Sequence, residues 1–443
     1  MKKVLVLGTG FVVKPMVDYF IDECKYKVLV ASRDNNNSGQ IIAGRPLGKR
    51  VLWHAKPPYK ELDTMINGVD LVVSMIPPSM HLIVAKACIK NRVNMVTTSY
   101  ISPELKALNK EVKEAGIIIL NEIGEDPGMD HMGAMQMIDM IKSEGGKVKS
   151  LTSYGAGIPS FEYNRNPFGY KFSWSPSGVI KAGNTPAVYT RNGTLHKVNG
   201  EDIFNHNRVV DIYNLGSFET YPNRDSTRYY KEYDLEVGID IYRGLLRHPG
   251  YCNSMQCLKE LGLMNTEVYY EYNNLTYKEF SLSLVNSANK TNNDVKTIIA
   301  NHLNLRKNSD IMLQFEWLGL FSDKKISIRK GTKADVLIDL MQKKMSYLPH
   351  EKDMIIVHND IIAEFDNRVE RRISTMKVEG RPYGHSAMSR AVSLPAAIAS
   401  KLILHGTIRQ KGVCMPTSQE IYKPVLDELA DHGYKFESKN FIL

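Results

Sequence analysis

Acidic side chains gather in the segment Asn121–Met132, directly after the predicted strand Ile117–Leu120. A Pro-Gly pair inside this segment breaks the strand, so the acids are held at its carboxyl end. Asp126 either serves the chemistry or forms the turn, and Asp130 is either the N-cap of the next helix or a functional acid. The sequence therefore predicts a candidate catalytic carboxylate at this strand end, with these alternatives open.

Arginine recurs in two further segments of the sequence. Tyr221–Thr227 contains Arg224, and Arg243–Arg247 ends in Arg247. Guanidinium groups bind carboxylates through paired hydrogen bonds, so both residues suit a substrate with several carboxylates, unless they are ordinary surface arginines. We predict no metal site, because no histidine pair has metal-ligand spacing together with an acid.

A nucleotide is the first ligand that the N-terminal segment predicts. The apolar run that begins at Val4 ends in Gly8-Thr9-Gly10. A strand that leads through a tight glycine turn into a helix leaves backbone N–H groups free to bind a pyrophosphate. The pattern is weak by itself, since Val13 takes the place of the third small residue, and an ordinary turn is the alternative.

The next predicted strand, Lys27–Ala31, leads into Ser32, Arg33 and Asp34. This position lies roughly 20 residues after the glycines, where dinucleotide-binding domains contact the adenine ribose. A hydroxyl and a guanidinium group suit the 2'-phosphate of NADP, whereas an acid would bind the 2'-hydroxyl of NAD. We predict NADP, and the alternative is that Arg33 is solvated and Asp34 contacts the ribose.

The elements that position these residues alternate between strand and helix. Apolar strands are predicted at Leu71–Ile76, Val93–Thr97 and Ile117–Leu120, with helices at His81–Asn91 and Ser102–Gly116. This alternation predicts an α/β fold with a doubly wound parallel sheet, whose ligand lies at the carboxyl ends of the strands.

The pattern of apolar residues changes after Gly145, from alternating strands and helices to successive strands. Ala187–Val198 is typical of a hairpin with an Asn-Gly turn, which indicates an antiparallel sheet. Helical patterns dominate between residues 242 and 344, a strand follows at Asp353–Val357, and Leu394–His405 is predicted as an apolar helix. We therefore expect more than one domain in these 443 residues.

Composition excludes several classes of protein. The net charge is +9 and the pI is near 9.0, but no basic tract interleaved with aromatic residues is present, so we expect no nucleic-acid partner. No uninterrupted apolar run approaches the roughly 18 residues that span a bilayer, so we expect no membrane partner. The five cysteines lack zinc spacing, and we expect free thiols and a cytoplasmic protein.

Several long motifs in order resemble the NADP-linked, glutamate-forming saccharopine dehydrogenases of lysine metabolism, also called saccharopine reductases. The motifs are Leu5–Pro15, Val96–Pro103, Asn121–His131, Tyr170–Ser175, Tyr221–Thr227, Trp317–Phe321 and Gly384–Met388.

The resemblance implies a homodimer of subunits with three domains. Residues 1–125 and about 385–435 would form the NADP-binding Rossmann domain, residues 126–241 and about 345–384 an α+β substrate-binding and dimerisation domain, and residues 242–344 a helical domain.

The resemblance also implies which residues hold the ligands. Asp126 and Tyr100 become the catalytic candidates, because the reaction needs a group that manages an amine proton. The expected cofactor contacts are Gly8, Gly10, Phe11, Val12, Ser32, Arg33, Met75, Ile76, Thr98, Ser99 and Ser175. The expected substrate contacts are Ser99, Tyr100, Asp126, Arg224, Leu245, Leu246 and Arg247.

The implied reaction joins L-glutamate to 2-aminoadipate 6-semialdehyde through an imine, which NADPH reduces to saccharopine. Gly155 stands where the family usually has cysteine, which leaves rate, direction and substrate preference open. One alternative is a related reductive condensation that forms a carboxylated polyamine. The other is a noncatalytic NADP sensor, because a fold does not guarantee a function.

Overall fold

The computed structural model describes residues 1–57, 59–285 and 294–443. These residues form two compact units. The first unit comprises Met1–Gly157, Tyr229–Ile239 and Met354–Leu443, and the second comprises Ile158–Arg228 and Asp240–Asp353.

A parallel sheet of seven strands forms the nucleotide half of the first unit, in the order β17-β6-β5-β4-β1-β2-β3. The predicted doubly wound parallel sheet is thus confirmed, and the order of strands reverses next to β1. The bounds are β1 Lys3–Leu7, β2 Lys27–Ser32, β3 Gly48–Leu52, β4 Leu71–Ser74, β5 Asn94–Val96, β6 Ile118–Leu120 and β17 Gly412–Cys414.

Helices connect these strands, because most of the strands are apolar and need cover, whereas β3 contains Lys49 and Arg50 and is partly exposed. They are α1 Lys14–Asp18, the π-helix η1 Tyr19–Glu23, α2 Asn35–Ile42, α3 Lys60–Asn67, the 3-10 helix η2 Pro78–Met80, α4 His81–Asn91, α5 Pro103–Ala107 and α6 Asn109–Glu114. The predicted helix over 102–116 is divided into α5 and α6, which meet at Leu108.

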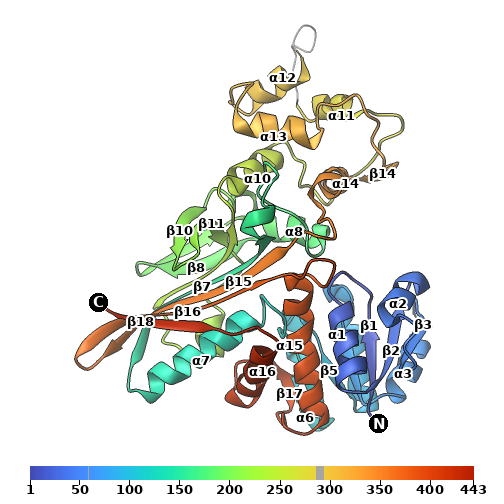
Figure 1. Cartoon of the computed structure of the whole chain (residues 1–443), viewed down its shortest axis with the longest axis vertical. Helices are drawn as coiled ribbons and strands as arrows, with labels where there is room; N and C mark the ends of the chain where they lie inside the picture. Colours follow the sequence, from blue (N-terminus) through green and yellow to red (C-terminus); the bar gives the residue numbers. More distant parts are fainter. Residues whose placement is uncertain (58, 286–293) are drawn as a thin grey trace. The chain divides into compact units, whose positions relative to one another are not determined.

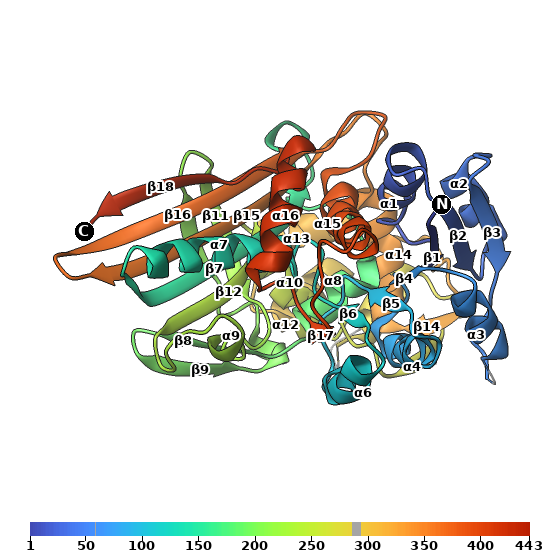
Figure 2. The ribbon, with the colours of Figure 1, turned by 90° about the horizontal axis from the view of Figure 1, so that it is seen from below.

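The C-terminal part of the chain completes this sheet. Helix α15 (Ala387–Leu404) lies beside α1 in Figure 1, and β17 pairs with β6 at the edge of the sheet. Helix α16 (Gln419–Asp431) lies next to both α15 and α7 (Met129–Ser143), as Figure 2 shows. The apolar helix predicted from Leu394 begins seven residues earlier, at Ala387, because Ser386 is its N-cap and its side chain accepts a hydrogen bond from the N–H of Ser389.

Helix α15 is the one helix among the described residues that is long and apolar enough to cross a membrane by length and composition. However, 78% of its 18-residue window is buried inside the structure, and Arg390 and Lys401 interrupt its apolar sequence. This burial is typical of a core helix.

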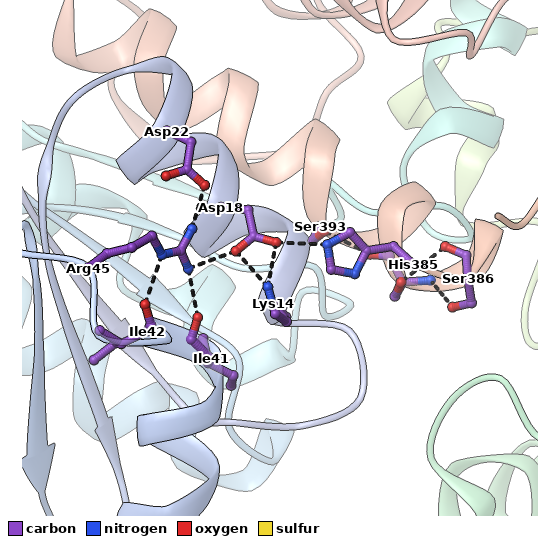
Figure 3. Close-up of polar contacts among 10 residues, drawn as sticks. Lys14, Asp18, Asp22, Ile41, Ile42, Arg45, His385, Ser386 and Ser393 are labelled. Carbon is purple, nitrogen blue, oxygen red and sulfur yellow. Dashed lines mark hydrogen bonds and ion pairs between the residues drawn. The ribbon is translucent and has the colours of Figure 1, made fainter. Parts of the chain in front are cut away.

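Asp18 joins the start of the chain to the loop before α15 (Figure 3). Its carboxylate accepts hydrogen bonds from Lys14 at 2.8 Å and from His385 Nε2 at 2.7 Å, and it pairs with Arg45 at 2.7 Å. Arg45 also contacts Asp22 and the carbonyl groups that end α2. The helix after the glycine turn is thereby fixed to two neighbouring segments of the same unit.

A second sheet in the first unit has the order β7-β15-β16-β18, with α7 packed against β16. The strands are β7 Lys147–Pro159, β15 Asp353–Phe365, β16 Arg368–Glu379 and β18 Glu437–Ile442, and α9 spans Tyr229–Glu232. The strand predicted at 353–357 is thus the start of a longer one, which pairs with β16 in antiparallel register.

The second unit contains an antiparallel sheet in which β11 lies between β10 and β12, and β8 pairs with β9 and β12. The predicted hairpin is confirmed, with Asn192 and Gly193 at φ values of 51° and 70° in its turn. The strands are β8 Ala187–Arg191, β9 Thr194–Val198, β10 Arg208–Ile212, β11 Gly216–Pro222 and β12 Asp240–Arg247.

Helices dominate the second unit after β12, so the expected helical segment begins beyond Arg247 and not at 242. Residues 286–293 of that segment lie outside the described residues. The elements are η3 Phe161–Tyr163, α8 Pro176–Gly183, η4 Gly200–Asp202, α10 Tyr251–Glu260, β13 Tyr269–Glu271, α11 Tyr277–Ser283, α12 Val295–His302, α13 Asp310–Leu318, β14 Lys330–Thr332 and α14 Lys333–Met345. The three-domain boundaries remain a prediction.

Candidate active site

The turn after β1 has the space and the donors that a pyrophosphate needs. Gly8 has φ 109°, and a Cβ there would lie 2.7 Å from the carbonyl oxygen of Met75, so only glycine fits. Gly10 faces open space. Among the backbone hydrogen bonds of the described residues, the N–H groups of Gly10, Phe11 and Val12 donate to no carbonyl. The residues present therefore fit the cofactor that the turn predicts.

The end of β2 offers a hydroxyl and a guanidinium group. Ser32 Oγ lies 3.0 Å from Thr9 Oγ1, which connects it to the glycine turn, and Arg33 is exposed. The Asp34 carboxylate instead caps α2 and accepts from the N–H of Asn36 at 2.8 Å. Because the acid is used as a cap, Ser32 and Arg33 are the better candidates for a 2'-phosphate.

Tyr100 and Asp126 meet at the carboxyl edge of the parallel sheet. The Tyr100 hydroxyl donates to Asp126 Oδ1 at 3.0 Å. On the other side, a Cβ added at Gly155 of β7 would lie 2.6 Å from Asp126 Oδ2. The Asp126 carboxylate thus lies between the Tyr100 hydroxyl and the backbone of Gly155, which has no side chain. The structure brings together the two residues that we expected to be catalytic.

The loops after β4 and β5 supply the other expected contacts at this edge. Met75 and Ile76 follow β4, and Thr98 and Ser99 follow β5. Thr98 Oγ1 lies 3.9 Å from Met75 Sδ, and Ser99 Oγ lies 2.9 Å from His81 Nε2. Since β4 and β5 are adjacent, these four residues share one edge of the sheet.

His81 is a candidate site residue that was not predicted from the sequence. It begins α4, is 1% exposed, and bonds Ser74 Oγ at 2.9 Å through Nδ1 as well as Ser99 through Nε2. Burial lowers the pKa of His81 to about 4, so the ring is neutral at pH 7. The sequence feature that could have identified His81 is its position two residues after Pro78-Ser79, beyond the end of a predicted strand.

The prediction that Asp130 is the N-cap of the next helix is wrong. Helix α7 begins at Met129 with Gly128 at the N-cap, so Asp130 lies in the first turn. Its side chain reaches back and accepts from the N–H of Gly128 at 2.6 Å. A carboxylate in the first turn of a helix is still favourable, because the free N–H groups there carry partial positive charge.

Arg224 and Arg247 belong to the second unit and have different surroundings. Arg224 is half-buried in a left-handed conformation (φ 58°), and its carbonyl accepts from the N–H of Val188. Arg247 is 3% exposed and donates to the Leu246 carbonyl at 2.7 Å and to Tyr221 at 3.1 Å.

Three aromatic rings surround the Arg247 guanidinium group at 5.2 to 5.5 Å, namely those of Tyr170, Tyr221 and Tyr251. Its Nε has no hydrogen-bond partner among the described residues. A buried cation with an unused donor is costly, and an anionic group would offset that cost.

The remaining predicted residues also lie in the second unit. On β12, Leu245 is half-buried, whereas Leu246 is fully buried and its side chain belongs to the core. Ser175 is exposed and caps α8, where its Oγ accepts from the N–H of Gly178 at 3.2 Å. Within the described ranges, no group of three or more His, Cys, Asp or Glu residues could hold a metal ion.

The strand order, the glycine turn and the edge residues together define a dinucleotide-binding α/β protein of the doubly wound class. Residues 4–120 match the saccharopine dehydrogenase NADP binding domain, and residues 124–434 match the saccharopine dehydrogenase C-terminal domain. The chain belongs to the saccharopine dehydrogenase family. The cofactor prediction, NADP, is confirmed by the first of these matches.

Curated relatives agree over the whole chain. A "Saccharopine dehydrogenase [NADP(+), L-glutamate-forming]" from Saccharomyces cerevisiae is 35% identical over 435 residues, which cover 97% of each chain. An "Alpha-aminoadipic semialdehyde synthase, mitochondrial" from Bos taurus is 36% identical over 457 residues. The present chain spans about half the length of the curated mammalian relatives that it matches, 48% in this case.

Solved structures agree with the fold. The apo saccharopine dehydrogenase (L-Glu forming) from Saccharomyces cerevisiae has a TM-score of 0.88 and 34% identity, with both chains covered completely. A homospermidine synthase from Legionella pneumophila, solved with NAD, has a TM-score of 0.60 and 11% identity over 99% of this chain and 91% of that one. The second likeness is one of fold alone.

Proposed function

We propose that this protein interconverts saccharopine with L-glutamate and 2-aminoadipate 6-semialdehyde, with NADP as cofactor, in lysine metabolism. The name of the Saccharomyces cerevisiae relative, which is matched over 97% of both chains, supports this choice of activity. The structural observation that carries the proposal is the hydrogen bond from Tyr100 to Asp126 at the carboxyl edge of the nucleotide sheet. A reaction at an amine needs such a proton-handling group beside the cofactor.

The amine of glutamate condenses with the aldehyde, releases water and forms an imine. The bound cofactor supplies a hydride to the imine carbon, and a proton completes the secondary amine of saccharopine. No bond to the protein forms, so the residues act by position and charge. Asp126 holds the amine proton or the water. The Tyr100 hydroxyl orients the Asp126 carboxylate by donating a hydrogen bond to its Oδ1.

The cofactor contacts follow from the nucleotide half of the first unit. The N–H groups of Gly10, Phe11 and Val12 bind the pyrophosphate, and Gly8 allows the close approach of the turn to β4. Ser32 and Arg33 bind the 2'-phosphate. Met75, Ile76, Thr98 and Ser99 line the nicotinamide end, and Ser175 is a further cofactor contact.

The carboxylates of the substrate require cations. Arg224 is half-buried, and Arg247 has an unused buried donor, so both suit this role. Leu245 contributes its side chain and Leu246 its backbone, because the Leu246 side chain is buried in the core. Ser99 and Tyr100 complete the substrate contacts.

A homodimer and a cytoplasmic location are further parts of the proposal. The homodimer is supported by the resemblance of the sequence motifs to the family. The cytoplasmic location remains a prediction, and the mammalian relatives differ in that their names include the word mitochondrial.

Absorbance of NADPH tests the activity directly. We expect oxidation of NADPH when L-glutamate and the semialdehyde are both present, and none with either alone. Oxidation that does not depend on glutamate would contradict the proposal, and oxidation with a diamine in place of glutamate would favour formation of a carboxylated polyamine. Binding of NADPH without turnover of any of these substrates would favour the noncatalytic sensor.

A further inference from the structure

A buried polar cluster in the first unit lies beside the proposed catalytic pair and has no role in the reaction as described above. Its centre is Glu122, which is fully buried and lies two residues after the end of β6. Glu122 Oε2 accepts from His131 Nε2 at 3.0 Å and from the Tyr229 hydroxyl at 3.1 Å. His131 is also fully buried, and its Nδ1 lies 2.6 Å from the Tyr233 hydroxyl.

The other oxygen of Glu122 holds the loop that carries Tyr100. Oε1 accepts from the N–H of Ile101 at 2.9 Å, and the N–H of Glu122 donates to the carbonyl of Ser99 at 3.0 Å. Tyr100 is thus fastened to Glu122 through the residue before it and the residue after it. Since the Tyr100 hydroxyl bonds Asp126, the position of that bond depends on Glu122.

The backbone of Glu122 is itself unusual. It has φ 55°, in the left-handed region, where a residue with a Cβ is strained. A buried carboxylate-histidine pair is also costlier than apolar residues of the same volume. Both features disfavour a purely structural role for Glu122, because apolar residues of similar volume would pack at lower cost.

The tyrosines of the cluster come from the segment Tyr229–Ile239. This segment packs in the first unit, whereas the chain on both sides of it belongs to the second unit. It follows the Arg224 turn by a few residues and leads directly into β12, which carries Leu245 and Arg247. The proposed substrate-binding stretches are therefore joined by the chain to the residues that hold Glu122.

We propose that Glu122 is a positioning residue, which, together with His131, Tyr229 and Tyr233, holds the 99–101 loop so that Tyr100 is aimed at Asp126. This inference rests on the proposed role of Tyr100 and Asp126 in catalysis. Glu122 does not touch the substrate in this proposal. It acts through Ser99 and Ile101.

The test compares kcat, the KM for saccharopine and the Kd for NADPH in the full-length variants Glu122→Gln, Tyr229→Phe and Tyr100→Phe. Tyr229→Phe keeps the buried ring and removes one hydrogen bond to Glu122, so it remains informative if Glu122→Gln does not fold. Asp234→Asn is the matched control, because it removes an exposed ion pair with Lys142 from the same segment.

We expect Glu122→Gln and Tyr229→Phe to lower kcat by about ten-fold, the effect of one buried hydrogen bond to a charged group, with the Kd for NADPH within about two-fold of wild type. Adding Tyr100→Phe to either variant should lower kcat by much less than it does in the wild type, because the effects of coupled residues are not additive. Asp234→Asn should have wild-type kinetics.

Two results overturn the inference. One is a wild-type kcat in folded Tyr229→Phe and Glu122→Gln at a temperature at which both are stable. The other is full additivity with Tyr100→Phe. If Tyr100→Phe alone leaves kcat unchanged, the proposed role of Tyr100 fails instead, so the two failures are distinguishable.

Discussion

Gly155 leaves the space that the carboxylate of Asp126 occupies in this structure. Its backbone conformation is not left-handed, so the limit on a side chain here is one of space and not of torsion. A Cβ there would lie 2.6 Å from Asp126 Oδ2 and 3.1 Å from Asp126 Cβ, and the carboxylate would have to move. The hydrogen bond from Tyr100 would lengthen as a consequence.

We expect Gly155→Ala to lower kcat by roughly 10- to 100-fold, since small displacements of a catalytic group are costly. Steady-state kinetics with saccharopine and NADP would measure the change. Ser153→Ala, on the same face of β7, makes a side chain smaller and serves as the control. A folded Gly155→Ala protein with wild-type kcat would disprove the positional argument.

Arg33 should decide the choice between NADP and NAD. The Asp34 carboxylate is engaged as the cap of α2, so the guanidinium group is the available charge at the end of β2. Arg33→Ala should weaken NADP binding by about 10- to 100-fold, because a charge-assisted pair with the 2'-phosphate is lost, and leave NAD binding nearly unchanged. Titration with both nucleotides tests this, and equal losses would remove Arg33 from the site.

Arg224 should act on substrate affinity. Arg224→Ala should raise the KM for saccharopine by about ten-fold through the loss of a carboxylate contact, while the Kd for NADP stays the same. Arg191→Ala is the control, because Arg191 is exposed at the end of β8 in the same unit. An unchanged KM in the Arg224 variant would exclude the contact.

At the scale of elements, the glycine turn depends on the placement of α1. Helix α1 is only five residues long. Its last residue, Asp18, forms ion pairs with Arg45 and with His385, which precedes α15 (Figure 3). Burial by itself would raise the pKa of Asp18, but hydrogen bonds from His385, Lys14 and Arg45 outweigh it and lower the pKa to about 2. The ionised carboxylate therefore stabilises the folded state.

We expect Asp18→Asn to destabilise the protein by about 1 kcal/mol at pH 7, since Asp18 is only half-buried and its ion pairs are screened by solvent. Because the folded pKa lies below the ordinary value of 3.8, this contribution is present above pH 3.8 and is lost as the pH falls toward 2. Thermal unfolding would measure it. Asp22→Asn, which loses one exposed contact with Arg45, should unfold at nearly the wild-type temperature, and equal effects of both variants would contradict the argument.

At the scale of the whole molecule, buried histidines contribute to the response to acid, among them His81 and His358. Burial lowers the pKa of His81 and of His358 to about 4, from an ordinary value of 6.5. Between these pH values the unfolded chain binds more protons than the folded protein, so stability falls as the pH drops from 6.5 to 4.

Each histidine should cost about 2 kcal/mol of stability at pH 5 relative to pH 7. The stability of His81→Gln should therefore fall by correspondingly less between these pH values than that of the wild type, although its stability at pH 7 is reduced by the lost contacts with Ser74 and Ser99. Urea unfolding at the two pH values measures the slopes. Parallel slopes for wild type and variant would show that His81 is already charged in the folded protein.

Local patterns in the sequence were sufficient for the alternating elements of the nucleotide half. Most strands there are short apolar runs, which are typical of strands buried on both faces of a parallel sheet. The partly exposed strand β3, which contains Lys49 and Arg50, was not predicted. The hairpin at Asn192-Gly193 was equally predictable, because the turn needs positive φ at both residues. The ends of the predicted strands and the family motifs likewise identified Tyr100 and Asp126 as candidates.

Tertiary structure decided what each candidate touches. The pairs Glu122–His131 and Asp18–His385 join residues whose spacing in the sequence carries no signal, since their residue numbers differ by 9 and by 367. The return of β17 to the edge of the sheet and the packing of 229–239 in the first unit depend on long-range burial as well. A sequence determines local conformation through short-range sterics and periodicity, whereas partners across the fold are chosen by the packing of the complete chain.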